Sequence, residues 1–300
     1  MADLSIVIVS WNVKKLLEEC LESIWKNQEN LTLEVFVSDN ASSDGTAEMV
    51  KTKFPQVKYI QNEGNIGFPK ANNRALRYVQ GKYFLFLNPD TIVAPNALPE
   101  MVKFMEEHPN CGALGPKLLN PNETLQPSCR SFPTLETQLY TTLFLDVLFP
   151  KSKLFGKYMM SYWNHDEIKE VDQPMGSALL VRRAALDNVC CFDENIFIWY
   201  DEVDLCSRIK KAGWKIYFTP KAKIFHYGGQ SFKQWKGIRK SLWGAYIWRK
   251  SRNYFFRKHY GGWQVPILIF LDALQFVIIL AAFYLLIKLA WSAAQFVFYP

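Results

Sequence analysis

The sequence has 300 residues, of which 49% are hydrophobic and 21% are charged, and its formal net charge is +7. This composition excludes an intrinsically disordered chain and allows one large core, or one domain with an appendage. The six cysteines have no CxxC spacing, which argues against a zinc site or a disulfide framework and favours a reducing compartment.

Strand-like and helix-like segments alternate through the first third of the chain. Short apolar runs predict strands over residues 5–10, 33–39, 57–61 and 83–87, and helical spacing predicts helices over 14–27, 42–54 and 69–80. The alternation predicts an α/β domain whose parallel sheet has helices on both faces. Ligands bind such sheets at the carboxyl ends of the strands, so the polar residues that follow each strand are candidates for a site.

Three local features complete this part of the chain. The Ser42–Gly45 run is expected to cap the second helix. The apolar run Ile6–Val9 is too short for a secretory signal, so we expect the catalytic part to stay in the cytosol. Residues 117–172, rich in Pro, Ser and aromatic residues, are expected to form loops with short helices over the site.

A carboxylate directly follows the strand over residues 83–87, in the run Asn88-Pro89-Asp90-Thr91. Placed at the carboxyl end of a strand, Asp90 suits a hard divalent cation whose other ligands are diphosphate oxygens and water. The alternative is an ordinary Pro-Asp turn after a strand.

A second acidic cluster, Asp201, Glu202 and Asp204, follows the apolar residues Phe197–Trp199. Mutual repulsion and an apolar setting raise the pKa of at least one such carboxyl group toward that of a general base. The alternative is an acid-rich first turn of a helix, which the helix dipole favours. The two interpretations are compatible.

His226 ends a strand-like run just before two glycines. A neutral imidazole there suits a metal site shared with Asp90, although a lone histidine at a strand end is more often structural. The glycine-bearing run Asn62–Phe68 matches neither the dinucleotide fingerprint nor the P-loop, and no G-x-S-x-G nucleophile motif is present.

The C-terminal third is basic and then apolar. Between Leu205 and Leu271 lie 15 of the 35 Lys and Arg residues and none of the 28 acidic ones. Val265–Ile287 holds one charge, Asp272, and exceeds the roughly 20 apolar residues that a membrane span requires. The basic flank predicts a cytoplasmic N-terminal side for this helix, with Trp263 and Trp291 as interface anchors. The alternative is a buried C-terminal helical hairpin.

Taken together and in order, these motifs resemble glycosyltransferase family 2, the inverting enzymes with the GT-A fold, and especially the rhamnosyltransferase-like branch that builds bacterial cell-surface polysaccharides. The resemblance covers about residues 5–231 and is carried by Val9-Ser10-Trp11-Asn12, Val37–Thr46, Asn65–Phe68 with Ala71-Asn72-Asn73, Leu87–Thr91, Gly115-Pro116, Gln126–Ser128 with Arg130, Gly176–Ala178, Phe192–Glu194, Asp201–Cys206, Gly213-Trp214 and His226–Ser231.

The resemblance implies a role for each matching position. It implies that Asp39 reads the nucleotide base, that Asn88 faces the ribose and diphosphate, that Asp90 binds Mg²⁺ or Mn²⁺ with help from His226, and that the general base is Asp201 or Glu202. The implied nucleotide-sugar site consists of Ser10, Asn12, Asp39, Asn65, Asn73 and Asn88, and the implied acceptor side consists of Gly176, Ser177 and Asp204.

The chain departs from the family pattern at the position of the general base. Family members usually carry Glu and then Asp before Val-Asp-Leu, whereas this chain has Asp201 and then Glu202. By motif position Glu202 holds the place of the base, one methylene longer than usual. Asn88 replaces the first Asp of Asp-x-Asp, as is typical of the branch, and Pro69 stands where alanine is commoner, in a helical first turn that tolerates proline.

These inferences predict a GT-A domain over 1–231, a basic amphipathic membrane-proximal segment over 232–263 and a hydrophobic membrane segment over 264–300. The predicted activity is metal-dependent, inverting transfer of a sugar, with rhamnose from dTDP-rhamnose as the first choice and a UDP-sugar as the alternative. The predicted acceptor is a lipid-diphosphate-linked glycan at the cytoplasmic face of the plasma (inner) membrane, and a homodimer is compatible with the sequence.

Two functions of other classes compete with this one. The first is a non-catalytic protein of the same fold that binds a glycolipid or a partner, which the swapped acidic pair favours. The second is nucleic-acid binding by the basic segment, which is disfavoured because that segment lacks a recognition motif and adjoins an apolar tail.

Overall fold

The computed structural model describes residues 2–230 and 238–298. The chain forms two compact units, Met1–Phe132 with Trp163–Phe255, and Pro133–Tyr162 with Phe256–Pro300. Residues 231–237, which contain the predicted boundary at 231/232 and the motif residue Ser231, lie outside the described residues. The three-segment division expected from the sequence therefore stays a prediction.

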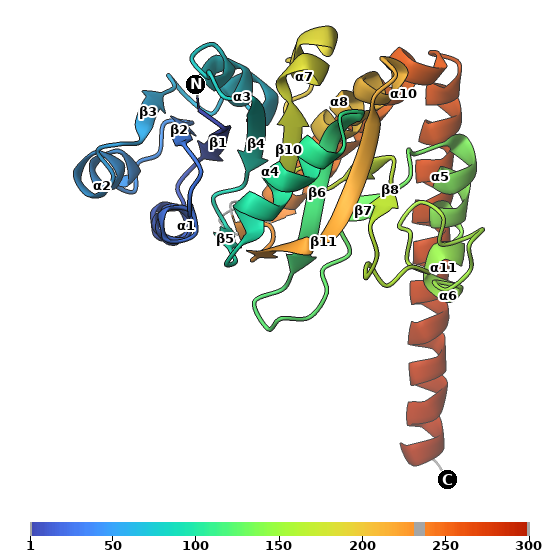
Figure 1. Ribbon diagram of the computed structural model, residues 1–300. Coiled ribbons are helices and arrows are strands. Elements are labelled where there is room, and N and C mark those ends of the chain that lie inside the picture. The colour runs from blue at the N-terminus through green and yellow to red at the C-terminus, as the bar shows by residue number, and fades with distance from the viewer. Residues whose placement is uncertain (1, 231–237, 299–300) are drawn as a thin grey trace. The chain divides into compact units, whose positions relative to one another are not determined.

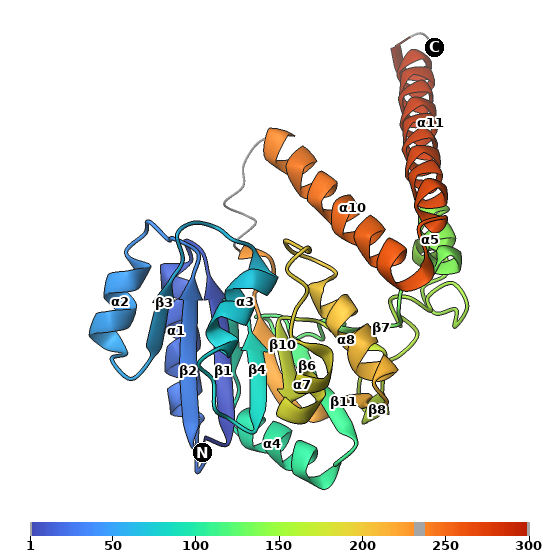
Figure 2. The same ribbon diagram turned by 90° about the horizontal axis from the view of Figure 1, so that it is seen from above.

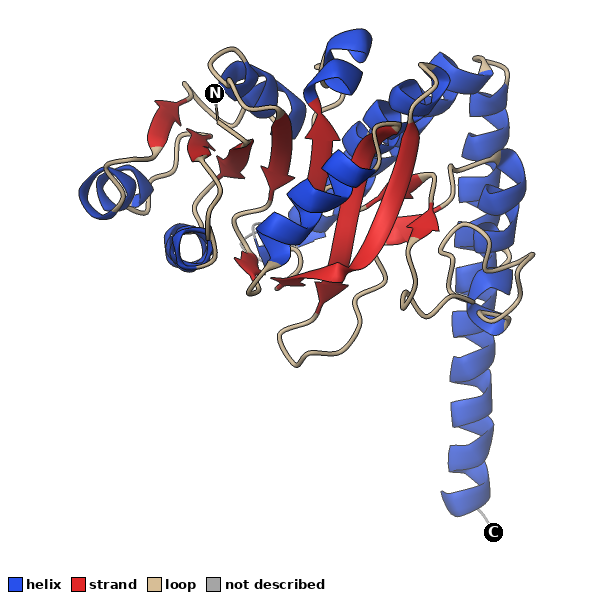
Figure 3. Ribbon diagram, in the orientation of Figure 1, coloured by secondary structure: helices blue, strands red, loops and turns tan. Residues whose placement is uncertain are grey.

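The first unit is built on a sheet of nine strands within the described residues (Figures 1 and 3). Its main order is β3-β2-β1-β4-β10-β6-β11-β5, and β8 pairs with β11. The strands are β1 (Leu4–Ser10), β2 (Leu33–Asp39), β3 (Lys58–Gln61), β4 (Tyr83–Leu87), β5 (Thr91–Val93), β6 (Cys111–Leu119), β8 (Lys169–Glu170), β10 (Ala178–Arg182) and β11 (Lys215–His226). A separate pair consists of β7 (Cys129–Arg130) and β9 (Gln173–Pro174).

The first four strands are parallel, as predicted; β1, β4 and most of β2 are buried, whereas β3 is partly exposed. The sheet as a whole is mixed, because β10 runs antiparallel to both β4 and β6, and β5 runs antiparallel to β11. A short apolar run shows that a strand is buried but does not show its direction. The prediction of a parallel sheet is thus correct for β1–β4 and incomplete for the rest.

Helices cover both faces of this sheet (Figure 2). Alternate residues of β1, namely Leu4, Ile6 and Ile8, share one core with apolar residues of α1 (Lys14–Lys26), α2 (Thr46–Lys53) and α4 (Ala97–Glu107). The opposite face is covered by α3 (Phe68–Leu76), α7 (Arg183–Val189) and α8 (Asp201–Lys211). The two-residue period of the strands therefore separates two apolar layers and leaves the strand ends for polar residues.

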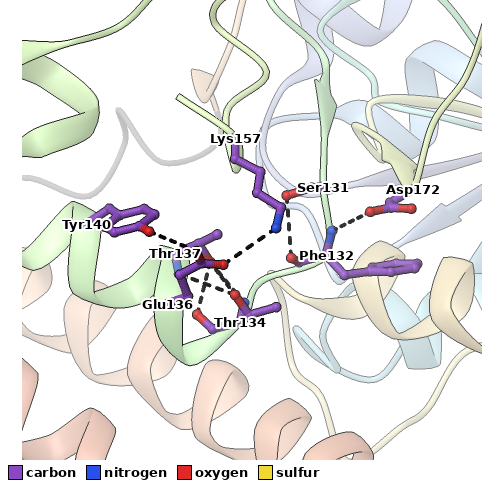
Figure 4. Close-up of polar contacts among 8 residues, drawn as sticks. All are labelled: Ser131, Phe132, Thr134, Glu136, Thr137, Tyr140, Lys157 and Asp172. Atoms are coloured by element: carbon purple, nitrogen blue, oxygen red, sulfur yellow. Dashed lines mark hydrogen bonds and ion pairs between the residues drawn. The ribbon is translucent and has the colours of Figure 1, made fainter. Parts of the chain in front are cut away.

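The second unit contains α5 (Leu135–Thr142), α6 (Leu145–Leu148), the end of α10 (Ile238–Tyr260) and α11 (Gln264–Phe298). Figure 4 shows the start of α5, where Thr134 and Thr137 form a reciprocal capping box and Glu136 accepts a hydrogen bond from Tyr140. These short helices lie within the region for which loops and short helices were expected. Within this unit, Gln275 of α11 donates to the Thr141 carbonyl at 3.4 Å.

Helix α11 is long and apolar enough to cross a membrane over Gln264–Leu289. Only 11% of its most apolar stretch is buried inside the protein. The described residues from 264 onward form one helix, in place of the buried hairpin considered as the alternative, and most of its residues up to 289 are exposed, as are Trp263 and Trp291. Such exposure favours attachment to a membrane.

Candidate active site

Strands β1 and β2 end at the same edge of the sheet, where Ser10 pairs in register with Asp39. Asp39 is fully buried, and its carboxylate accepts hydrogen bonds from the backbone N–H and the hydroxyl of Ser42, at 2.8 and 2.5 Å. Ser10 is also fully buried, and its hydroxyl has no partner among the described residues. A buried unpaired hydroxyl is costly unless a ligand or water completes it, so Ser10 fits a ligand-facing role.

The loop after β2 is held by side chains from both strand ends. The Asn12 side-chain oxygen accepts a bond from the Ser43 N–H at 2.7 Å, and the Asn12 N–H donates to the Ser42 hydroxyl at 2.7 Å. The N-cap of α2 is Gly45, within the run Ser42–Gly45 that was expected to cap this helix, and Asp44 accepts a hydrogen bond from the Thr46 N–H at 3.2 Å. Ser42 itself forms hydrogen bonds with Asp39.

Two of the predicted nucleotide-sugar residues hold loops in this structure. Asn65 accepts bonds from the Gly67 N–H and from the Asn40 amide, both at 3.2 Å. The Asn73 amide exchanges two bonds with the Phe192 backbone, at 2.9 and 3.0 Å. Contact of Asn65 and Asn73 with a nucleotide sugar stays a prediction.

Asn88 connects the strand ends to the predicted acceptor side. Its backbone N–H donates to the Ser177 carbonyl at 2.9 Å. The neighbouring Gly176 lies directly against Glu202, since a Cβ added at Gly176 would come within 3.2 Å of the Glu202 Cβ. The structure thus links Asn88, Ser177, Gly176 and Glu202 in one chain of contacts.

Asp90 and His226 meet across β5 and β11, although 136 positions separate them in the sequence. His226 pairs in register with Thr91, and its Nε2 lies 3.4 Å from Asp90 Oδ1. Both side chains are buried. Burial raises the pKa of the Asp90 carboxyl, but the hydrogen bond and charge attraction of the protonated form of His226, together with the Gln230 N–H, outweigh it, so that its pKa lies below the ordinary value.

The donor atoms of this pair fit a divalent cation. Gln126 donates to Asn120 and to the His226 carbonyl, which leaves its side-chain oxygen to accept from His226 Nδ1 at 2.7 Å. Nε2 then carries a lone pair, and it has no hydrogen-bond partner among the described residues. This is the arrangement of a metal-binding histidine whose tautomer is set by its other nitrogen.

No group of three or more His, Cys, Asp or Glu side chains capable of holding a metal occurs in the part of the chain that the structure describes. Asp90 and His226 supply only two protein ligands. A cation here would therefore need oxygen ligands from a diphosphate and from water, as Mg²⁺ does in many nucleotide sites.

The two candidate bases differ in their surroundings. Asp201 begins α8 and is buried, whereas Glu202 is partly exposed. Burial and the neighbouring Glu202 charge raise the pKa of Asp201 well above its ordinary value. Burial also raises the pKa of Glu202, although its own N–H, the charge of Arg130 and the Gly176 N–H act in the opposite direction. Glu202 is thus the accessible carboxyl group of the two.

Asp204 is fully buried and forms an ion pair with Arg208 one turn later on α8, at 2.8 Å. This ion pair gives Asp204 a structural role, which is to stabilise α8. Its placement on the acceptor side stays a prediction.

Two residues near these groups had no assigned role in the sequence analysis beyond the family motif. Gln126 orients His226 from 100 positions away, and Arg130 is the cation that acts on Glu202. Both belong to the family motif, but neither lies at a fixed spacing from the residue it acts on. No periodicity could therefore have shown that Gln126 contacts His226 or that Arg130 acts on Glu202.

Comparison with known proteins identifies the family. Residues 5–161 match the family described as "Glycosyl transferase family 2". The chain is 27% identical over 275 residues to N-acetylglucosaminyl-diphospho-decaprenol L-rhamnosyltransferase of Mycobacterium tuberculosis, covering 88% of this chain and 87% of that protein. It is 27% identical over 233 residues to the rhamnosyltransferase WbbL of Escherichia coli K12, covering 74% and 82%.

The fold agrees with this assignment. The crystal structure of GalNAc-T7 with UDP, GalNAc and Mn²⁺ superposes with a TM-score of 0.58 at 15% identity, covering 92% of this chain and 55% of that one. The chain belongs to glycosyl transferase family 2. It is a glycosyltransferase with the GT-A fold, as the motifs predicted, followed by an apolar C-terminal helix.

Proposed function

We propose that this glycosyltransferase transfers L-rhamnose from dTDP-rhamnose to a glycan carried on a membrane lipid diphosphate, with inversion at the anomeric carbon. The name of the mycobacterial relative describes such an acceptor and such a sugar, and that similarity extends over 88% of this chain. The observation that carries the proposal is the pairing of a buried carboxylate with an oriented imidazole, Asp90 with His226, at the sheet edge that also presents Asn88.

Asp90 and His226 would hold a divalent cation, either Mg²⁺ or Mn²⁺. When bound, this cation would neutralise charge on the departing nucleoside diphosphate. Asp90 would supply the charged ligand, and Gln126, which accepts from His226 Nδ1, directs Nε2 of the neutral imidazole at the site.

Glu202 would act as the general base. As the acceptor hydroxyl oxygen bonds to the anomeric carbon and the bond to the nucleoside diphosphate breaks, the hydroxyl proton passes to the Glu202 carboxylate. The raised pKa of Glu202 brings its basicity closer to that needed at neutral pH. Gly176 lies directly against this side chain, where an added Cβ would come within 3.7 Å of the Glu202 Cδ.

The membrane places enzyme and acceptor together. The exposed apolar surface of α11 would insert into the bilayer, and the basic residues that precede it would bind anionic lipid on the cytoplasmic side of the plasma membrane. A lipid-linked acceptor would then diffuse in two dimensions to the catalytic unit.

A donor screen tests this function. Detergent-solubilised full-length protein is incubated with dTDP-, UDP- or GDP-sugars, with or without a lipid-diphosphate-GlcNAc acceptor, and nucleoside diphosphate release is followed with Mg²⁺, Mn²⁺ or EDTA. We expect release from dTDP-rhamnose that requires both metal and acceptor. Acceptor-dependent release from a UDP-sugar alone would show that the donor is that UDP-sugar and not dTDP-rhamnose. Nucleotide binding without turnover on any acceptor would favour the non-catalytic alternative.

Removing the predicted metal carboxylate tests the site itself. We expect Asp90→Ala and the size-matched Asp90→Asn to lower turnover by a factor of about 10³ or more, because the cation loses its charged ligand. Asp166→Asn, on a largely exposed carboxylate paired with Lys117, is the control. Full activity of both Asp90 variants would remove Asp90 from the metal site.

A further inference from the structure

The loop between Asp193 and Tyr200 leads directly into the helical turn that carries Glu202. Its last two residues, Trp199 and Tyr200, have φ angles of 59° and 63°. Bulky L-amino acids rarely adopt this left-handed conformation, and seldom twice in succession. The start of α8, and with it the direction of Glu202, therefore depends on contacts that hold this loop from outside.

Helix α10 supplies polar contacts to the loop. The Ser251 hydroxyl donates to the Ile198 carbonyl at 2.9 Å, and the Tyr254 hydroxyl donates to Asp193 Oδ2, also at 2.9 Å. Ser251 and Tyr254 are three positions apart and lie on one face of the helix. The same Asp193 side chain accepts a bond from the Asn195 N–H, so one carboxylate ties the loop both to itself and to α10.

Aromatic side chains extend this contact to the turn itself. The Tyr200 ring packs against Phe255 and Trp248 of α10, with ring centroids 5.6 and 5.9 Å apart. Phe197 meets Trp243 edge to face at 5.8 Å. Tyr200 is buried by these neighbours, which helps to hold the left-handed conformation of its backbone.

The other side of the loop is fixed to the sheet domain through α3. The Phe68 N–H donates to the Phe197 carbonyl at 2.9 Å, and Gly67 approaches so closely that an added Cβ would lie 2.6 Å from the same carbonyl oxygen. The loop is thus held between the start of α3 and one face of α10.

We infer that α10 is a positioning element for the general base, with Tyr254 and Ser251 as positioning residues that act on Glu202 through the 193–200 loop. This inference rests on the proposed function, in which Glu202 receives the proton. It gives α10, which is rich in Lys and Arg, a role in catalysis that is separate from any contact with lipid.

The test uses the full-length protein in detergent, which removes the contribution of a bilayer. Tyr254→Phe deletes one hydroxyl, Ser251→Ala deletes the other, and Ser251→Thr restores a hydroxyl. Tyr246→Phe, on an exposed tyrosine about two turns earlier on α10, is the matched control. For each protein we measure kcat, donor KM, the pH profile of kcat, the Tm, and amide hydrogen exchange of residues 192–204.

We expect Tyr254→Phe to lower kcat about tenfold with donor KM changed less than about twofold, because small displacements of a catalytic group affect the transition state more than ground-state binding. A looser loop admits water to Glu202, so its pKa falls toward the ordinary value and the acidic limb of the profile moves to lower pH. Exchange over 192–204 should rise several-fold, and Ser251→Thr should recover most of what Ser251→Ala loses.

The inference is overturned if Tyr254→Phe keeps the wild-type kcat and pH profile, or if it loses no more activity than Tyr246→Phe. Unchanged exchange over 192–204 overturns it as well, even when no donor is turned over. Failure of the proposed function looks different, because the wild-type protein would then release no nucleotide from any donor, whatever the state of α10.

Discussion

At the ends of β1 and β2, the predicted site residues Ser10 and Asp39 are neighbours by strand register, and Ser42 and Ser43 of the following loop form hydrogen bonds with Asp39 and Asn12. We call this the β1–β2 rim. The β10–β11 rim, formed by Asp90, Gly176, Glu202 and His226, is assembled from four remote segments. Its groups are held by partners such as Gln126 that lie about a hundred positions away.

From this difference we expect the β1–β2 rim to serve donor binding and the β10–β11 rim to serve the chemical step. In the β1–β2 rim, Asp39 and Asn12 are held by hydrogen bonds and the buried Ser10 hydroxyl has no partner among the described residues, which suits the binding of a rigid ligand. The β10–β11 rim contains the groups that retain a reactive property, namely the lone pair of His226 Nε2 and the raised pKa values of Asp201 and Glu202. Variants of the β10–β11 rim should therefore act on turnover and metal, and those of the β1–β2 rim on donor affinity.

The largest effect is expected at Glu202. Glu202→Gln should lower kcat by a factor of about 10³, because the isosteric amide accepts no proton, with donor affinity nearly unchanged. Asp201→Asn should cost about tenfold at most, since its raised pKa favours the neutral form. Single-turnover kinetics of both variants decide between the two acids, and a reversed order would assign the base to Asp201.

The same pair predicts two pH dependences. The kcat of the wild-type protein should fall as pH drops through the raised pKa of Glu202, and Glu202→Gln should flatten this limb. For Asp201 the folded state holds the proton more tightly, so its contribution to stability is complete below the unfolded pKa and is lost as pH rises through the folded pKa. Asp201→Asn should therefore raise the Tm at pH 8 and have little effect near pH 4, as calorimetry can show.

An intermediate effect is expected at Gln126. Gln126→Leu removes the acceptor that orients His226 and should weaken Mn²⁺ binding about 10- to 100-fold, with recovery of turnover at high metal concentration. Metal titration of nucleotide release measures this shift, and Gln80→Leu, at an exposed position, is the control. An unchanged metal dependence would mean that His226 does not bind the cation through Nε2.

The smallest effect is expected in the β1–β2 rim. Asp39→Asn leaves one acceptor oxygen for the two Ser42 donors, loosens the loop and should raise donor KM about tenfold with little change in kcat. Asp3, which accepts the Thr32 N–H at the opposite end of the same strands, provides the control Asp3→Asn. A loss confined to kcat would contradict the division of labour between the two rims.

Sequence patterns predicted much of the first unit. The strands β2 and β4 have the predicted bounds, and α1 and β3 differ by one residue at one end. Local patterns were sufficient here, because β4 and most of β2 are buried apolar runs and α1 packs one apolar stripe. The same patterns could not show that β10 runs antiparallel, nor that α8 begins after two left-handed residues.

The amino-acid sequence by itself determined the family, the order of elements through β4, the apolar C-terminal helix and the identity of the candidate acids and imidazole, because these depend on residue type, local spacing and motif order. Only the tertiary structure decided that Asp90 faces His226, that Gln126 orients this imidazole, that Glu202 rather than Asp201 is accessible, and that α10 holds the loop before it. Those contacts join segments 50 to 140 positions apart, and such pairings form only when the sheet and its covering helices pack together.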